Sequence, residues 1–286
     1  MSVRAPRVPL ASLLVAVALA LAVPAWAQQQ LPGGSDGRPV EINADNAIEW
    51  HQTERAYVAR GHASAKRGET TVFADVLTAY YREVPDKGTE IFQLVAQGNV
   101  HIVSPQQEVF GDRAVYDTDR QLGVVTGKEL RLVTKNDLVT ARDTLEYYDA
   151  QNFAVARGDA VAVRNQDRMR ADVLIGTFVK GPNGASELTR IDGSGNVVVT
   201  TPTDVATSDK LVYSVKDEVA VLIGDVKITR GDNQIVGEAA EMNTRTKVNR
   251  VIAGKDASGR VRGLLIPGSQ PPGTAQATGA AAPAAR

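Results

Sequence analysis

Gly98-Asn99-Val100-His101-Ile102 is the clearest copy of a short pattern that recurs along the whole chain. In each copy a glycine is followed by a small or polar residue and then by alternating apolar residues. This alternation is typical of β-strands, in which successive side chains point to opposite faces of the sheet. The other copies are Gly195-Asn196-Val197-Val198-Val199, Gly224-Asp225-Val226-Lys227-Ile228 and weaker stretches that begin at Gly61, Gly127 and Gly158.

The spacing of these glycines indicates that a block of three units is duplicated. Gly61, Gly98 and Gly127 each have an equivalent glycine 97 residues further on. The neighbouring residues repeat too, since Val58-Ala59-Arg60-Gly61 returns as Val155-Ala156-Arg157-Gly158. Repeats of this length predict a stacked architecture in which each unit completes the core of its neighbour.

The alternating stretches are separated by turn residues, and the sequence shows no helical pattern. Pro85-Asp86-Lys87-Gly88 and Gly231-Asp232-Asn233 are typical turn sequences. We also interpret Gly-Asn and Gly-Asp in the repeated pattern as tight turns of antiparallel hairpins. The sequence therefore predicts an all-β fold built from repeated hairpins, for which a sandwich, jelly roll, barrel or solenoid is possible. The repeats favour an open stack over a closed barrel.

The two ends of the chain differ from the repeats in composition. Residues 1–27 have the features of a cleaved signal peptide: Arg4 and Arg7, the apolar run Leu10–Val23, and Ala25-Trp26-Ala27 at the cleavage site. The alternative is an uncleaved anchor, but this 14-residue segment is short of the roughly 20 residues that span a bilayer. We expect a flexible leader over 28–39, a structured domain over 40–266 and a disordered tail over 267–286. The mature protein is then expected outside the cytoplasm.

Candidate catalytic and metal-binding groups are sparse. The chain has no cysteine and three histidines, and the net charge of −1 gives no basic surplus for nucleic acid. Gly33-Gly34-Ser35-Asp36-Gly37 matches a nucleophile motif formally, but it lies in the leader and not between a strand and a helix. Asp75, Asp112, Asp172 and Asp209 recur at equivalent positions, which indicates hydrogen bonding in the fold. We expect no enzyme activity, no cofactor and no metal.

The ordered set of repeats resembles the OstA-like family of lipopolysaccharide transport. The residues that carry this resemblance are Ala44-Asp45-Asn46-Ala47-Ile48, Gly98-Asn99-Val100-His101-Ile102, Gly111-Asp112-Arg113-Ala114-Val115-Tyr116 and Gly224-Asp225-Val226-Lys227-Ile228. The resemblance implies a β-jelly roll open into a V-shaped groove that holds the acyl chains of lipid A. It also implies a periplasmic bridge between an inner-membrane anchored partner and an outer-membrane barrel partner. The alternative is a structural envelope protein with a closed, ligand-free β core.

Two sets of residues are candidates for binding. The apolar positions after each glycine should face one side of the sheet and line the lipid site: Val100, Ile102, Val197, Val199, Val226 and Ile228. The terminal strands should be docking edges, because nothing in their sequence blocks strand addition and head-to-tail self-association becomes possible. The residues of these partner edges are Val40, Ile42, Leu264, Leu265 and Ile266.

Overall fold

A computed structural model describes residues 40–85, 88–180, 186–243, 245–246, 248–253 and 259–266. The predicted signal peptide, leader and tail lie outside these residues. The described residues contain no helix that is long and apolar enough to cross a membrane.

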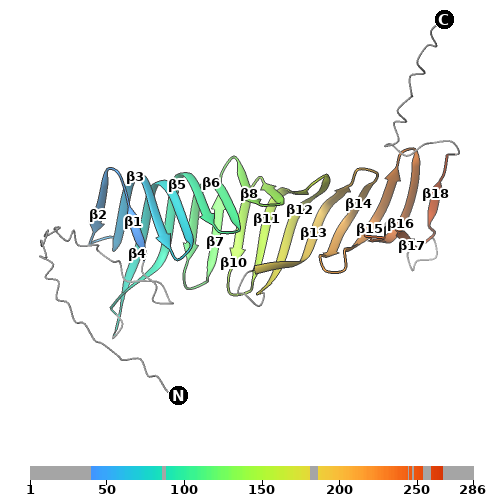
Figure 1. Cartoon of the computed structure of the whole chain (residues 1–286). Coiled ribbons are helices and arrows are strands. Elements are labelled where there is room, and N and C mark those ends of the chain that lie inside the picture. The colour runs from blue at the N-terminus through green and yellow to red at the C-terminus, as the bar shows by residue number, and fades with distance from the viewer. Residues whose placement is uncertain are drawn as a thin grey trace, which may run out of the picture. The chain divides into compact units, whose positions relative to one another are not determined.

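The described chain forms an antiparallel sheet of 18 strands, which confirms the all-β prediction (Figure 1). The strands of the first part are β1 (Glu41–Asn43), β2 (Ala47–His51), β3 (Ala56–Arg67), β4 (Thr70–Val84), β5 (Gly88–Ser104), β6 (Gln107–Asp117), β7 (Leu122–Thr126) and β8 (Leu130–Thr134). The second part comprises β9 (Asp137–Ala141), β10 (Thr144–Tyr148), β11 (Phe153–Arg164), β12 (Asp167–Lys180), β13 (Ser186–Thr200), β14 (Val205–Ser214), β15 (Val219–Arg230), β16 (Asn233–Asn243), β17 (Asn249–Ile252) and β18 (Arg262–Leu264).

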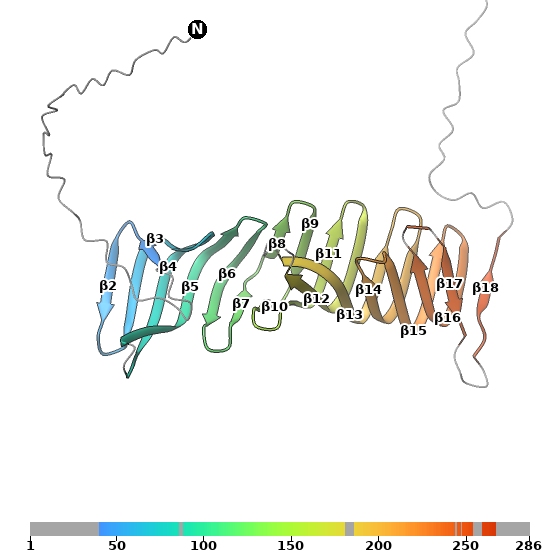
Figure 2. The ribbon, with the colours of Figure 1, turned by 60° about the horizontal axis from the view of Figure 1, so that its bottom comes forward.

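The long strands each belong to two layers. The first half of β3 pairs with β2 and its second half pairs with β1, so the strand crosses from one layer to the other. We call layer A the part of the sheet that contains β2, β7, β10 and β17 with the strand segments paired to them. Layer B contains β1, β8, β9 and β18 with the remaining segments. Successive hairpins extend the two layers together (Figure 2).

The repeated glycines mark the corners between the layers, which corrects our interpretation of them as hairpin turns. Gly98 and Asn99 both have a positive φ, of 77° and 48°, in the middle of β5. The pairing register of β5 with β6 shifts between Gln97 and Val100, so one extra residue is accommodated. Such a β-bulge bends the strand locally. Equivalent bulges lie at Gly61-His62, Gly158-Asp159, Gly195-Asn196 and Gly224-Asp225.

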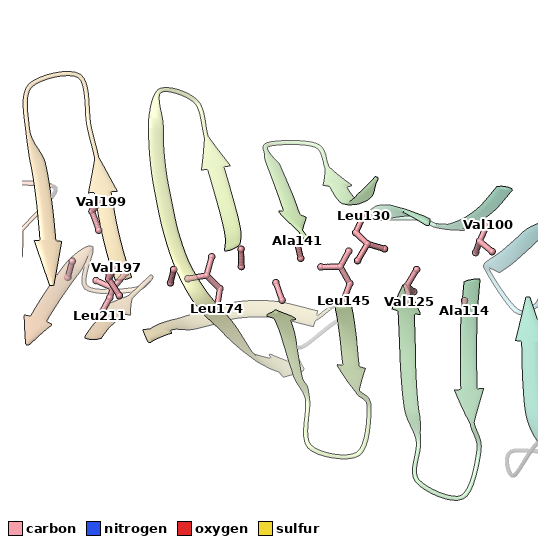
Figure 3. Packing of buried hydrophobic residues seen from close by; sticks show 14 of the residues in the cluster. Val100, Ala114, Val125, Leu130, Ala141, Leu145, Leu174, Val197, Val199 and Leu211 are labelled. Carbon is pink, nitrogen blue, oxygen red and sulfur yellow. The ribbon is translucent and has the colours of Figure 1, made fainter. Parts of the chain in front are cut away.

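One hydrophobic cluster joins the two layers. Leu130 of layer B and Leu145 of layer A, from two neighbouring pairs of short strands, point toward the same space (Figure 3). The most deeply buried large side chains of the cluster are Leu211, Leu222, Val100, Val197 and Val226. Aliphatic burial of this kind contributes about 25 cal/mol for each Å² removed from water, and it is the main force that holds layer A to layer B.

Candidate functional site

The inner faces of the two layers are lined by rows of side chains that run across the strands. The row nearest the corner is small and aliphatic in both layers and is almost fully buried. In layer A it contains Ala59, Leu77, Ala96, Ala114, Val125, Leu145, Ala156, Leu174, Leu211, Leu222 and Ala240. In layer B it contains Ala63, Ala74, Val100, Leu130, Ala141, Ala160, Ala171, Val197 and Val226.

The second row of layer B is apolar along its length. Val72 pairs with Ile102, which in turn pairs with Val109, and the same register continues through Leu132 and Val139. Most of these side chains are only partly buried, although they pack against the cluster. The row is Ile42, Ala65, Val72, Ile102, Val109, Leu132, Val139, Ala162, Met169, Val199, Ala206, Ile228 and Ile235. The row forms an apolar strip across the sheet, to which each strand contributes one residue.

The second row of layer A carries hydroxyl groups as well. Tyr57, Tyr116, Tyr147 and Tyr213 occupy it, and the cross-strand register connects them through small or aliphatic residues. Burial raises the pKa of the Tyr57 phenol, and burial with the nearby Asp149 carboxylate raises that of Tyr147. These phenols therefore stay protonated and can donate hydrogen bonds.

The third row of layer B is polar and lies at the ends of the strands. Arg164 donates two hydrogen bonds to Asp137, at 2.5 and 2.9 Å, and Arg230 donates two to Asp204, at 2.6 and 2.8 Å. These contacts raise the pKa of both guanidinium groups. The inner surface thus changes from apolar at the corner to polar at the strand ends. This polarity suits an amphiphile whose acyl chains lie inside and whose head group stays in water.

The structure places the six predicted lipid-binding residues in the two inner rows of layer B, on the separate strands β5, β13 and β15. Val100, Val197 and Val226 are 2%, 1% and 0% exposed and belong to the first row of layer B. The other three, Ile102, Val199 and Ile228, lie in its second row. Since they all contact the shared cluster, the facing deduced from alternation agrees with the structure. Leu130 and Leu132 of β8 also point inward, toward the same cluster.

The predicted edge residues divide into two groups. Val40 is buried and Ile42 packs against the core, so the first strand offers its backbone and not these side chains. Leu264, Leu265 and Ile266 are exposed. The apolar side chains exposed at the other end are Ile48 and Trp50 of β2, at 55% and 56%. Sequence reasoning missed both, although they alternate with Glu49 as in an edge strand.

The recurring aspartates hold the corners. Asp75 accepts hydrogen bonds from the Asn99 amide at 2.9 and 3.2 Å, and Asp172 accepts one from Asn196 at 2.9 Å. Asp112 accepts a bond from the backbone of Lys128. The predicted structural role is therefore correct, although the partners lie on the next strand for Asp75 and Asp172 and between β7 and β8 for Asp112. Groups of histidine and acidic residues that could hold a metal ion are absent from the described residues.

Two shallow hollows lie beside these corners, with volumes of about 450 and 500 Å³. Both are lined by Asp159, Arg170 and Asp172, and the first also contains the ion pair of Arg142 with Asp143. The hydrogen bonds of Arg170 and Arg142 lower the pKa of Asp159 and Asp143. Their lining is highly charged, so the hollows do not suit an apolar ligand.

Together, the duplicated antiparallel sheet and its graded interior define a class of β-proteins that can enclose part of an amphiphile. The chain belongs to the family described as "LptA/(LptD N-terminal domain) LPS transport protein", whose model matches twice, at residues 41–143 and 139–248. This is a family of transport proteins and not of enzymes.

Comparisons with individual proteins add little detail. A structural similarity was found to LptH from Pseudomonas aeruginosa, described as the LptA homologous periplasmic component of the lipopolysaccharide transport device. The identity is 20% and the TM-score 0.40, over 46% of this chain and 95% of that one. No curated protein matches the sequence significantly.

Proposed function

We propose that this protein is a non-enzymatic periplasmic carrier that holds lipopolysaccharide by its lipid A acyl chains between layers A and B. The observation that carries the proposal is the apolar second row of layer B, which crosses the sheet without a charged side chain. Because each buried CH₂ is worth about 0.8 kcal/mol, several acyl chains need such a cover throughout their passage through water. Because the row is apolar on every strand, an acyl chain that moves along it stays in apolar surroundings.

The carrier would form a bridge that receives its cargo from an inner-membrane anchored partner and delivers it to an outer-membrane barrel partner. Membership of a lipopolysaccharide transport family supports this role. The periplasmic location rests on the predicted signal peptide over 1–27, and the predicted domain limits of 40–266 cover both family matches. The terminal strands would be the docking edges for these partners.

Site-specific photo-crosslinking tests the carrier role. A photoreactive residue at Ile102, Val199 or Ile228 should capture lipopolysaccharide in cells, because these side chains face the interior. The matched controls are His101 and Lys227, which are on the same strands and face outward. Equal capture from both faces would contradict the proposed site.

A second candidate role is a structural envelope protein with a dry interior. The near-complete burial of Leu222 and Val226, both 0% exposed, favours it. The same experiment separates the two candidates, since a dry core predicts no lipid capture from Ile102, Val199 or Ile228.

A further inference from the structure

Two of the long hairpins extend beyond the neighbouring strands of layer A. We call their outer parts the first arm, Tyr81–Val84 with Gly88–Ile91 of β4 and β5, and the second arm, Phe178–Lys180 with Ser186–Leu188 of β12 and β13. Each arm begins at a second shift in strand register, between Tyr80 and Tyr81 and between Thr177 and Phe178. Such a bulge bends the strand, and Figure 2 shows the ends of both hairpins turned across the direction of the other strands.

The two arms occupy equivalent places in the duplication. Tyr81 and Phe178 are separated by the 97 residues of the repeat, and so are Arg55 and Asn152. The backbone N–H of Tyr81 donates to the carbonyl of Arg55 at 2.9 Å, and that of Phe178 donates to the carbonyl of Asn152 at 2.8 Å. The same backbone hydrogen bond therefore anchors both arms at their base.

The second arm bends over the inner surface of layer A. Gly176 lies in the second row of this layer, and a Cβ on it would stand 3.1 Å from a Leu188 methyl group and 3.6 Å from the Phe178 ring. Tyr147 of the same row contacts Ser186 of the arm. Phe178 and Leu188 therefore lie above the inner face, yet both are only partly buried.

The first arm reaches further and contacts layer B. Tyr81 and Ile91 are 7% and 2% exposed, and they form a buried cluster with Ala79 of layer A. Tyr57 of layer A packs against this cluster, and so does Ile42 from the second row of layer B. The first arm therefore spans the opening between layers A and B and fills it with its own side chains.

Aromatic contacts hold the first arm in this position. The indole N–H of Trp50 donates to the Tyr81 hydroxyl at 2.7 Å, and the Trp50 ring stacks on Tyr57 with 5.9 Å between centroids. The Tyr57 and Tyr81 rings are 5.1 Å apart. Three rings thus connect the arm to the wall of layer A.

The place beneath the second arm is less filled. The residues equivalent to Tyr57 and Ile42 are Ala154 and Val139, which are both smaller. Among the described residues, Phe178 and Leu188 belong to neither of the buried clusters. The loss of a ring and a methylene group leaves the apolar underside of the second arm without the cover that the first arm has.

We propose that the second arm is a third wall of the lipid site, beneath which an acyl chain lies between Phe178 and Leu188 on one side and Val139 on the other. Tyr81 and Ile91 of the first arm occupy the equivalent place and exclude an acyl chain from it. The inference rests on the proposed function and states where the open side of the lipid site is covered.

The lining of this place supports an acyl chain as its occupant. Phe178 and Leu188 are aromatic and aliphatic, and Val139 continues the apolar second row of layer B through its neighbour Leu132. Removing such side chains and an acyl chain from water together is favourable. The charged hollows at the outer corners have no comparable lining.

Photo-crosslinking at matched positions tests the inference. A photoreactive residue at Leu188 should capture severalfold more lipopolysaccharide in cells than one at Val179, which is 48% exposed and points away from the interior. One at Val139 should likewise exceed one at Ile42, although the two positions are equivalent in the duplication. Tyr81→Ala removes the ring that fills the first place, so it should raise capture at Ile42 severalfold. Far-UV spectra confirm that each variant keeps its strands.

Two results support or overturn the role of the second arm. Strong capture at Leu188 with little at Val179 supports it. Capture at Ile102 without capture at Leu188 overturns it and leaves the carrier role intact. If every position is silent, Ile102 included, the carrier role is contradicted and the inference fails with it.

The first arm is judged by the matched positions. Equal capture at Ile42 and Val139 in the unaltered chain would mean that Tyr81 and Ile91 do not exclude the lipid, and this overturns the inference. A folded Tyr81→Ala variant with no gain at Ile42 overturns it as well. If Tyr81→Ala does not fold, the comparison of Ile42 with Val139 decides.

Discussion

The Asp75 carboxylate occupies the space that a side chain on residue 98 would need. Its Oδ2 atom lies 2.1 Å from the position of a Cβ on Gly98, and the amide of Asn99 donates to both of its oxygens. Asp172 has the same relationship with Gly195, and Asp209 with Gly224. A glycine on one strand and a carboxylate on the preceding strand therefore form the recurring corner that joins layer A to layer B.

Substitution of Gly98 by alanine should destabilise the protein by about 1–3 kcal/mol, because it combines a φ of 77° with a clash against Asp75. The matched control is Gly88→Ala, where φ is 78° but a Cβ would meet nothing within 4 Å. Urea denaturation of both variants measures the difference. Equal losses would mean that backbone strain, and not the Asp75 contact, dominates.

The corners show how far the sequence could predict this fold. Alternation identified the strands, and the 97-residue spacing identified the duplication. The pair Gly98-Asn99 was interpreted as a hairpin turn because both turns and bulges require residues that adopt a positive φ. Local sequence does not distinguish them. The difference depends on the length of strand that follows, and β5 continues to Ser104.

The interior was predictable only in part, for a related reason. Alternation after each glycine is enough to assign the facing of Val100 and Ile102. Predicting the polar third row requires the pairing register of whole strands. Asp204 and Arg230, for example, lie at the open ends of the β14–β15 hairpin, 26 residues apart in the sequence.

Replacing Asp204 by alanine should cost about 1–3 kcal/mol, since the carboxylate is nearly buried and accepts two hydrogen bonds from Arg230 and one from Thr203. The matched control is Asp192→Ala. Asp192 also accepts two hydrogen bonds from an arginine, Arg190, but that pair is more exposed, so a loss below about 1 kcal/mol is expected. Thermal unfolding compares the two. A larger loss at Asp192 would show that burial is not the deciding factor.

The β2 edge should be sensitive to pH through His51. Hydrogen bonds to Glu49 and Glu54 raise the pKa of this imidazole above its ordinary value of 6.5. Its contribution is then fully present below pH 6.5 and is lost as pH rises through the raised pKa. The Glu49 pKa is lowered, mainly by His51, so its contribution is lost as pH falls below the ordinary 4.5.

We therefore expect the slowest hydrogen exchange of the β2–β3 hairpin between about pH 4.5 and 6.5, after correction for the intrinsic rate. The His51→Gln variant should lose this dependence. A pH profile that is unchanged in the variant would exclude His51 as its source.

A bulky side chain in the second row of layer B should obstruct the lipid without unfolding the protein. Ala162 lies between Val139 and Met169 in the cross-strand register, near the middle of the chain, and is only partly buried. We expect Ala162→Phe to keep the strand spectrum and to cost little stability. Ala160→Phe, at a 0% exposed position of the first row, should destabilise by about 1–3 kcal/mol or more through overpacking.

The measurement is the ratio of lipid captured at Val199 to lipid captured at Ile102, which are on opposite sides of Ala162 along the sheet. If lipid passes along the sheet from β5 to β13, Ala162→Phe should lower this ratio severalfold, because the added ring fills the second row of layer B at β11. The control is Val161→Phe on the outer face of the same strand, which should leave the ratio unchanged. An unaltered ratio in a folded Ala162→Phe variant would mean that the lipid does not travel along the second row, even if it binds there.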